Sequence, residues 1–120
     1  MLIDDINHNR LLEAKVADLK PYKILIIGNI IVNQIKDILE IPLRENNINA
    51  QVTFADYDNF VQASSMASEY HAVIVFWEAC NFVKGMHYKC NIWEQKEVDN
   101  FIQKVKSEIS FTLQNLNSIP

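Results

Sequence analysis

The stretch KILIIGNIIVNQIKDIL, residues 23–39, decides the fold class expected for this chain of 120 residues. Its aliphatic run at 24–27 shows little alternation, which is typical of a strand buried on both faces of a parallel sheet. A buried strand that turns into a helix at a glycine is where α/β domains carry a phosphate-binding loop or a nucleophile. Here the turn reads Gly28-Asn29-Ile30. A helical spacing of apolar residues follows it, at Ile31, Ile35, Ile38 and Leu39.

The other apolar patterns predict two more strands and three more helices. AQVTFA at 50–55 alternates, and HAVIVFW at 71–77 is apolar and rich in β-branched residues, so both are expected to be strands. A short helix and a loop should lie between them, and Pro42 should kink or end the helix before them. One helix is expected within 1–22 and a long one over 92–117. Their apolar stripes consist of Ile3, Ile6, Leu11, Leu12, Val16 and Leu19, and of Val98, Phe101, Ile102, Val105, Ile109, Leu113 and Leu116.

This alternation of strands and helices is typical of an α/β domain. We expect a single domain over 1–120 with three α/β/α layers, flavodoxin-like or SGNH-like, and a short parallel sheet with right-handed crossovers. Residues 23–78 would form its βαβαβ segment. Three strands are fewer than the usual number of about four to six. Either a partner covers the edges of the sheet, or the chain is the first part of a larger domain.

Charge and composition narrow the classes of function. The formal net charge is −4, from 15 acidic and 11 basic residues, without a run of one sign, so neither nucleic acid nor a membrane surface is expected as a partner. The N-terminus carries acids where an export signal carries bases, and the apolar runs are much shorter than the roughly 20 residues that cross a bilayer. We therefore expect a cytoplasmic protein.

Ligands of open parallel sheets bind at the carboxyl ends of the strands. The candidate ligand-binding residues are those that follow the three expected strands: Gly28 and Asn29, Asp56 and Tyr57, and Trp77, Glu78 and Asn81. A structural interpretation is open for several of them. Asn29 could cap the next helix, Asp56 or Asp58 the one after, and Trp77 could belong to the core.

No catalytic residue, metal site or cofactor is predicted. Gly28 by itself makes neither the dinucleotide-binding nor the P-loop fingerprint. The serines within 64–68 fall in a polar loop rather than on a strand-to-helix turn, and no histidine can be assigned as a partner of Cys80. Cys80 and Cys90 also lack the spacing of zinc or redox motifs.

The opening stretch, extended to KILIIGNIIVNQIKDILEIPLRENNINAQVTFADYDNFVQ and followed by YHAVIVFW, resembles the N-terminal segment of FkbH-like proteins. In that family an SGNH-hydrolase-like domain precedes a phosphatase-like domain of the haloacid dehalogenase superfamily. The likeness covers residues 23–78, a little under half of the chain. It depends on the strand that ends in glycine, the NQI of the helix, the ADYD element and the hydrophobic third strand.

The resemblance implies that Gly28, Asn29 and Ile30 correspond to the motif whose serine is the SGNH nucleophile. Ile30 holds the serine position, and an aliphatic side chain cannot form an acyl-enzyme. The leading hypothesis is a non-catalytic SGNH-like recognition or assembly domain of a biosynthetic protein. An acyl carrier protein or a phosphatase domain of the haloacid dehalogenase type would be its partner. Two alternatives stay open: a hydrolase or acyltransferase completed by another chain, and a flavodoxin-like module that binds a small molecule.

The last helix also predicts self-association. Over 93–116 it would be about 36 Å long, whereas strands of about six residues span only about 20 Å. We expect its last third to overhang the sheet and to form a homodimer. The alternative is that the first helix folds back over the overhang through Leu12, Val16 and Leu19.

Overall fold

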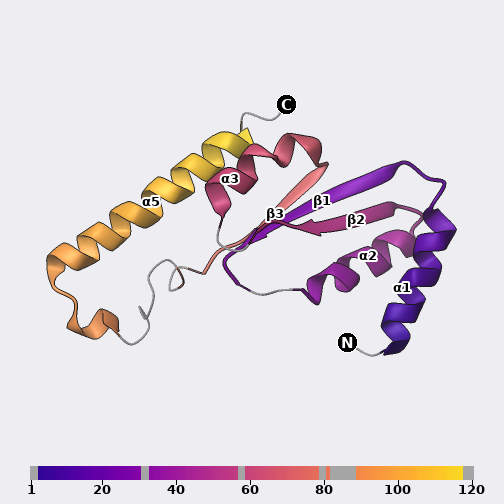
Figure 1. Cartoon of the computed structure of the whole chain (residues 1–120), viewed down its shortest axis with the longest axis horizontal. Helices are drawn as coiled ribbons and strands as arrows, with labels where there is room; N and C mark the ends of the chain where they lie inside the picture. The colour runs from indigo at the N-terminus through magenta and orange to yellow at the C-terminus, as the bar shows by residue number, and fades with distance from the viewer. Residues whose placement is uncertain (1–2, 31–32, 57–58, 79–80, 82–88, 118–120) are drawn as a thin grey trace.

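The computed structural model describes residues 3–30, 33–56, 59–78, 81 and 89–117. Its elements are α1 (Ile3–Val16), β1 (Pro21–Gly28), α2 (Ile35–Glu45), β2 (Asn49–Phe54), α3 (Phe60–Ser65), the 3-10 turn η1 (Ala67–Glu69), β3 (Ala72–Phe76), a second 3-10 turn, η3 (Cys90–Ile92), and α5 (Gln95–Asn117). The three strands form one parallel sheet in the order β2-β1-β3. Figure 1 shows this sheet between α1 and α2 on one side and α3 and α5 on the other. The predicted α/β class with a short parallel sheet is confirmed.

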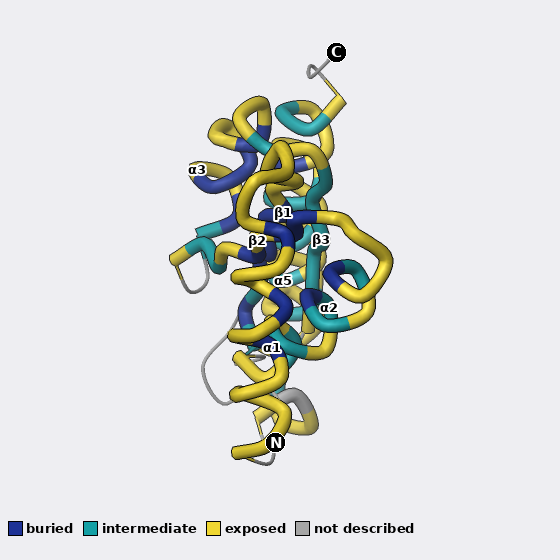
Figure 2. The backbone as a smooth tube through the Cα atoms, turned by 90° about the vertical axis from the view of Figure 1, so that its right-hand side faces the viewer, coloured by how far each residue is buried: buried dark blue, intermediate teal, exposed yellow. Residues whose placement is uncertain are grey.

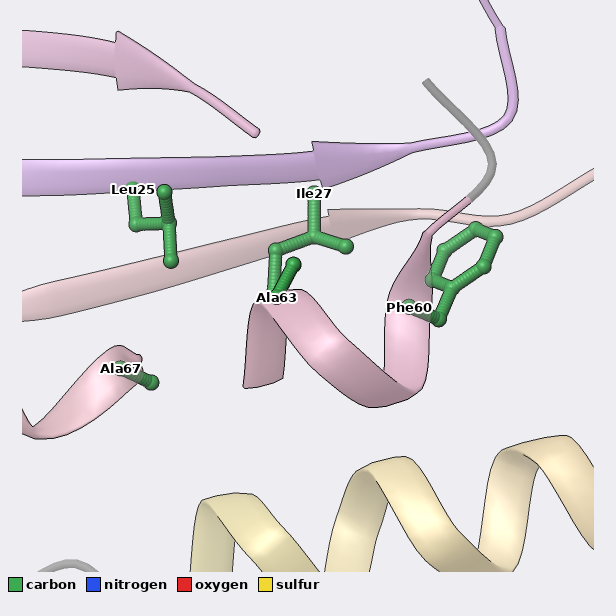
Figure 3. Packing of buried hydrophobic residues seen from close by; sticks show 5 residues of the cluster. All are labelled: Leu25, Ile27, Phe60, Ala63 and Ala67. Carbon is green, nitrogen blue, oxygen red and sulfur yellow. The ribbon is translucent and has the colours of Figure 1, made fainter. Parts of the chain in front are cut away.

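The central strand, β1, is buried on both faces. Its residues 24–27 each expose 4% or less of their surface. On one face, Ile24 and Ile26 pack with Val52 beneath the apolar side of α2. On the other, Leu25 and Ile27 pack against Phe60, Ala63 and Ala67, which come from α3 and η1 (Figure 3). Because helices cover both faces of β1, its residues 24–27 are all apolar and do not alternate with polar ones.

The third strand is an edge strand. All five residues of β3 are half-buried, although its sequence is the most apolar of the three. It pairs with β1 from Ile24 opposite Ala72 to Gly28 opposite Phe76. In the part of the chain that the structure describes, no strand pairs with its outer edge.

Pro42 lies inside α2, which continues to Glu45. Of the two expectations, that Pro42 kinks the helix or ends it, the second is therefore wrong. The next two residues hold the last turn in place from both sides. Leu43 packs against the sheet cluster, and Arg44 is buried in a polar network with α1. These contacts offset the loss of the backbone hydrogen bond that proline, without an N–H, cannot donate.

The helix α1 buries less of its apolar stripe than predicted. Leu12 and Val16 are buried, whereas Ile3 is 76% and Leu11 72% exposed. The reason is that α1 packs on α2 rather than on the sheet. Figure 2 accordingly shows buried positions only at intervals along α1. Because α1 and α5 lie on opposite sides of the sheet (Figure 1), α1 does not fold back over α5, and that alternative is wrong.

The last third of α5 does not overhang, so that prediction is wrong. Thr112 is fully buried, and Asn115 Nδ2 donates to Val61 O at 3.1 Å and to Ser64 Oγ at 3.0 Å. These contacts fix the C-terminal part of α5 on α3. The half that extends away is the N-terminal one (Figure 1).

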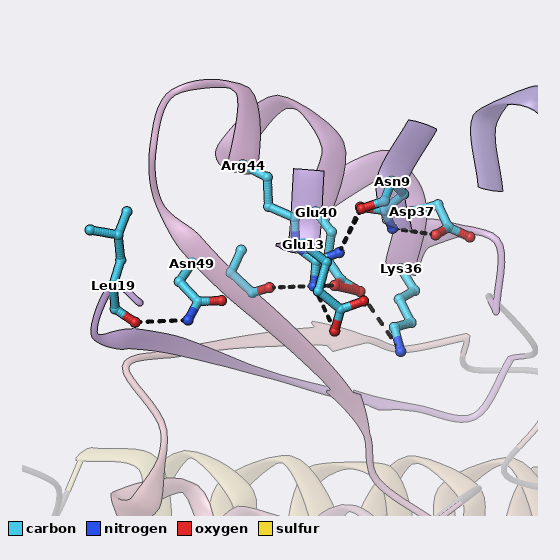
Figure 4. A network of polar contacts seen from close by, with 9 residues as sticks. Asn9, Glu13, Leu19, Lys36, Asp37, Glu40, Arg44 and Asn49 are labelled. Atoms are coloured by element: carbon cyan, nitrogen blue, oxygen red, sulfur yellow. Dashed lines mark hydrogen bonds and ion pairs between the residues drawn. The ribbon is translucent and has the colours of Figure 1, made fainter. Parts of the chain in front are cut away.

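A buried polar network joins α1, α2 and β2 (Figure 4). Arg44 exposes 3% of its surface and forms an ion pair with Glu40, which exposes 1%. Arg44 Nη1 donates to Asn9 Oδ1 at 2.7 Å, and its Nη2 donates to Ala50 O at 3.0 Å. Asn9 Nδ2 in turn donates to Asp37 Oδ1 at 2.6 Å. One guanidinium thus holds three elements together.

Burial raises the pKa of Glu40 above its ordinary value of 4.5. Arg44 and Lys36 oppose this by favouring the ionised carboxylate, while Asp37 and Glu13 add to the rise. The folded state therefore holds the proton of Glu40 more tightly than the unfolded chain does.

We predict that Arg44→Met lowers the free energy of unfolding by about 3–5 kcal/mol, because it leaves the carboxylate of Glu40 buried without its partner. Urea denaturation followed by circular dichroism measures the loss. The matched control is Arg10→Met on the exposed side of α1, which should change stability by about 0.5 kcal/mol or less. Equal stability of both variants would contradict the role given to Arg44.

We also predict a pH signature of Glu40. As the pH rises from below 4.5 through the raised pKa of Glu40, the parent should lose stability relative to Glu40→Gln, which has no proton to release. Denaturation of both proteins across this pH range gives the difference. A parent that gains stability relative to the variant would mean that Arg44 outweighs burial.

Candidate functional site

The turn after β1 brings the backbone of β1 close to that of β3. A Cβ atom on Gly28 would lie 3.3 Å from Phe76 O and 3.5 Å from Phe76 Cβ. The next residue, Asn29, donates its backbone N–H to the same oxygen at 3.3 Å. Glycine is therefore used here for a close approach of two strands.

The side chain of Asn29 continues the pairing of these two strands. Its Nδ2 donates to Glu78 O at 2.8 Å, and its Oδ1 accepts from Glu78 N at 2.8 Å. The last backbone pair of β1 and β3 is Gly28 and Phe76. Beyond it, the side-chain amide of Asn29 makes the two hydrogen bonds to Glu78 that a backbone peptide group would make in a longer strand. Asn29 is 0% exposed, so this side chain is a buried clamp between β1 and β3.

Asn81, on the exposed side of this clamp, bonds both of its residues. Its Nδ2 donates to Asn29 O at 2.8 Å and lies 2.9 Å from Glu78 Oε2. Its backbone N–H donates to Glu78 O at 3.1 Å. Three of the residues chosen from the sequence, Asn29, Glu78 and Asn81, therefore do come together. Their polar groups are largely directed at one another.

Of the other candidates, Trp77 packs on the core, and neither Asn29 nor Asp56 caps a helix. Trp77 is half-buried and packs against the core cluster, with its ring tilted relative to that of Phe60 and 4.7 Å between the ring centroids. The capping interpretation of Asn29 is wrong, since α2 is preceded by Gln34 at its N-cap. Asp56 does not cap α3 either, because Asn59 holds that position. Tyr57, Asp58, Cys80 and His87 lie outside the described residues.

A hollow of about 240 Å³ lies between the end of β2 and α3. Its apolar floor includes Leu25 and Ala63, and the exposed carboxyl group of Asp56 stands at its side. The remaining lining residues are Thr53, Phe54, Ala55, Asn59, Gln62, Met66 and Tyr70. The hollow exists because α3 covers β1 while leaving the outer face of β2, at Thr53, exposed.

This hollow includes Asp56 but not Asn29. Among the described residues, Asn29 instead bonds Glu78 and Asn81 and does not line this hollow. The sequence analysis also missed Asn59, Gln62 and Met66, which line the hollow from one side of α3 and its ends. Their spacing of three and four residues would have placed them on one helical face.

The described part of the chain holds no group of three or more histidine, cysteine, aspartate or glutamate residues that could bind a metal ion. None of the helices within it is long and apolar enough to cross a membrane.

Comparison with known proteins finds no matching family model, no matching curated protein and no matching solved structure. We therefore infer the function from the geometry of the clamp and of the hollow.

We predict that Asn29→Asp lowers the free energy of unfolding by about 2–3 kcal/mol, because a carboxylate oxygen would then face Glu78 O without a proton between them. Thermal and urea denaturation measure this. Asn33→Asp, at an exposed position after the same turn, is the control and should stay within about 0.5 kcal/mol of the parent. Unchanged stability of Asn29→Asp would show that the clamp is dispensable.

Proposed function

We propose that this chain is a non-catalytic, SGNH-like recognition domain of a biosynthetic protein that acts on carrier-bound substrates. The proposal rests on the contacts made by the turn after β1. An SGNH hydrolase would present its nucleophile there, whereas here Asn29 is buried and bonded to Glu78, and the half-buried Ile30 follows. A turn whose polar groups hold two strands together has no free group to attack a substrate.

The hollow between β2 and α3 is the proposed recognition site. It combines an apolar floor with polar side chains at its rim, the usual arrangement of small-ligand sites. The carboxylate of Asp56 can accept hydrogen bonds from ligand N–H groups, and the amide of Gln62 can donate or accept. Its volume of about 240 Å³ admits only a narrow ligand. An extended chain with amide N–H groups and short apolar links, such as the pantetheine arm of a carrier protein, has the required chemistry.

Titration with pantetheine tests the recognition site. We expect saturable chemical-shift changes of backbone amides in 53–56 and 59–66, the segments that line the hollow. Met66→Trp should weaken binding by at least about tenfold, which is about 1.4 kcal/mol, because the larger side chain fills the hollow from an exposed position.

The control is Ile38→Trp, at an exposed position on α2, which should bind pantetheine as the parent does. Shifts confined to other parts of the sheet, or equal binding by Met66→Trp, would refute the hollow as the site.

The absence of hydrolase chemistry is tested separately with activated acyl esters. The parent and Ile30→Ser should both lack turnover, because the new hydroxyl would have no assigned base to activate it. Turnover by Ile30→Ser that the parent lacks would reveal such a base and favour the hydrolase alternative.

A further inference from the structure

The two edges of the sheet differ in sequence. In β2, the polar residues Gln51 and Thr53 are exposed and alternate with less exposed ones, which is typical of an edge strand. β3 reads AVIVF and contains no polar residue. Its side chains pack alternately on the two core clusters: Ala72, Ile74 and Phe76 on the α2 side, and Val73 and Val75 on the α3 side. β3 therefore has the composition of an interior strand, like β1.

The position of β3 in the sheet does not match this composition. All five of its residues are half-buried, whereas residues 24–27 of the central strand expose 4% or less. Natural edge strands are commonly protected by charged side chains or prolines, and β3 contains neither. Its outer edge is therefore suited to pairing with another strand.

The hydrogen bonds to β1 show which backbone groups of β3 face outward. His71 N donates to Lys23 O at 2.8 Å, so the backbone groups of His71 face β1. Successive residues of a strand direct their N–H and C=O groups to opposite sides. Val73 and Val75 therefore also bond towards β1. The N–H and C=O groups of Ala72 and Ile74 face outward, and Ile74 is the middle residue of β3.

This arrangement is self-complementary about Ile74. In an antiparallel pair with a two-fold axis perpendicular to the sheet, each Ile74 donates its N–H to the Ile74 O of the second copy. Ala72 of each copy then lies opposite Phe76 of the other. Both copies keep α2 on one side of the sheet and α3 on the other, so each apolar face continues across the axis. A two-fold axis along the strands would instead invert one copy and set its α2 side beside the α3 side of the other.

The polar residues at the ends of β3 fit the same register. Continued beyond the strand, it places Glu78 opposite Tyr70 of the second copy and next to His71 of the second copy. His71 Nδ1 accepts the backbone N–H of Lys23 at 3.0 Å, so the ring proton is on Nε2, which is a donor. The hydroxyl of Tyr70 is also a donor. A carboxylate thus meets hydrogen-bond donors rather than another acid.

The chain has surface to spare for an interface. Its accessible surface is 8213 Å², and a compact monomer of this mass would expose only about 6,700 Å². The excess of about 1,500 Å², to which the open edge of β3 contributes, is larger than the roughly 800 Å² that each partner gives to a standard interface.

We propose that the chain forms a two-fold dimer through antiparallel pairing of the outer edges of β3. The pairing joins two three-stranded sheets into one continuous sheet. The occupant of the edge is a second copy, because one register satisfies the outward backbone groups, continues both apolar faces and matches the polar ends. Such a contact closes on itself, and the solvated edge of β2 limits further growth. Residues 72–76 do not line the hollow, so the dimer is independent of the proposed recognition function.

Sedimentation equilibrium of the full chain tests the dimer. The parent should have twice the monomer mass at micromolar concentration. Ile74→Pro should weaken the dimer at least about 100-fold, because it removes the central hydrogen bond from each copy and places two proline rings at the axis. The variant should stay folded by circular dichroism, since the lost N–H does not bond to β1. Ile74→Val keeps the N–H and is the control that should remain dimeric. A monomeric parent, or a folded Ile74→Pro that is as dimeric as the parent, would overturn the proposal.

Amide hydrogen exchange of the parent tests the interface without a substitution. On dilution from dimer to monomer, the amides of Ala72 and Ile74 should exchange at least about tenfold faster, because they lose their partners. The amides of Val73 and Val75 bond to β1 and are the internal control, which should change much less. A dimer whose dissociation leaves the exchange of Ala72 and Ile74 unchanged would place the interface elsewhere and refute the pairing of β3.

Discussion

The hydrogen bonding of β1 is the constraint on which the rest of the structure depends. A strand buried on both faces has no access to water, so its backbone groups must bond to neighbouring strands along their full length. β2 and β3 supply these bonds in parallel register on its two sides. Where the pairing with β3 ends, the amide of Asn29 continues it by bonding both backbone groups of Glu78. At the carboxyl end of the sheet, this clamp joins β1 and β3 but not β2.

The two faces of the sheet are stabilised in different ways. On the α3 side, contacts are apolar and centre on Leu25, Ile27 and Phe60. On the α2 side, an apolar layer meets the sheet, but the outer helix α1 is held by the buried guanidinium of Arg44 and the amide of Asn9. Apolar contacts tolerate small shifts, whereas a buried ion pair requires defined geometry. We infer that the polar network sets the position of α1 on α2.

The small size of the sheet accounts for the hollow beside β2. With three strands, α3 cannot cover both β1 and the outer face of β2, and this leaves the hollow beside Asp56. It also gives α5 too little to pack on, and this leaves the N-terminal half of α5 extended. The hollow and the extended half of α5 share no residues.

The sequence by itself determined the positions of β1 and β3, the α/β class and the length of the last helix. Each of these follows from the spacing of apolar residues, which reports how a segment is buried. The stripe of α1 was read in the same way and was largely wrong. That helix buries Asn9 rather than Ile3 or Leu11, because it packs on a polar part of α2.

The tertiary structure alone decided what the polar residues do. Asn29 bonds a residue 49 positions away, and Arg44 bonds Asn9 across 35 positions. A lone asparagine or arginine carries no periodic signal, so its partner is set by which segments the fold brings together. The same holds for Asn59 and Gln62, whose polar side chains look like ordinary surface until α3 is placed beside β2. Local spacing encodes burial, whereas the pairing of polar groups exists only once distant segments are in contact.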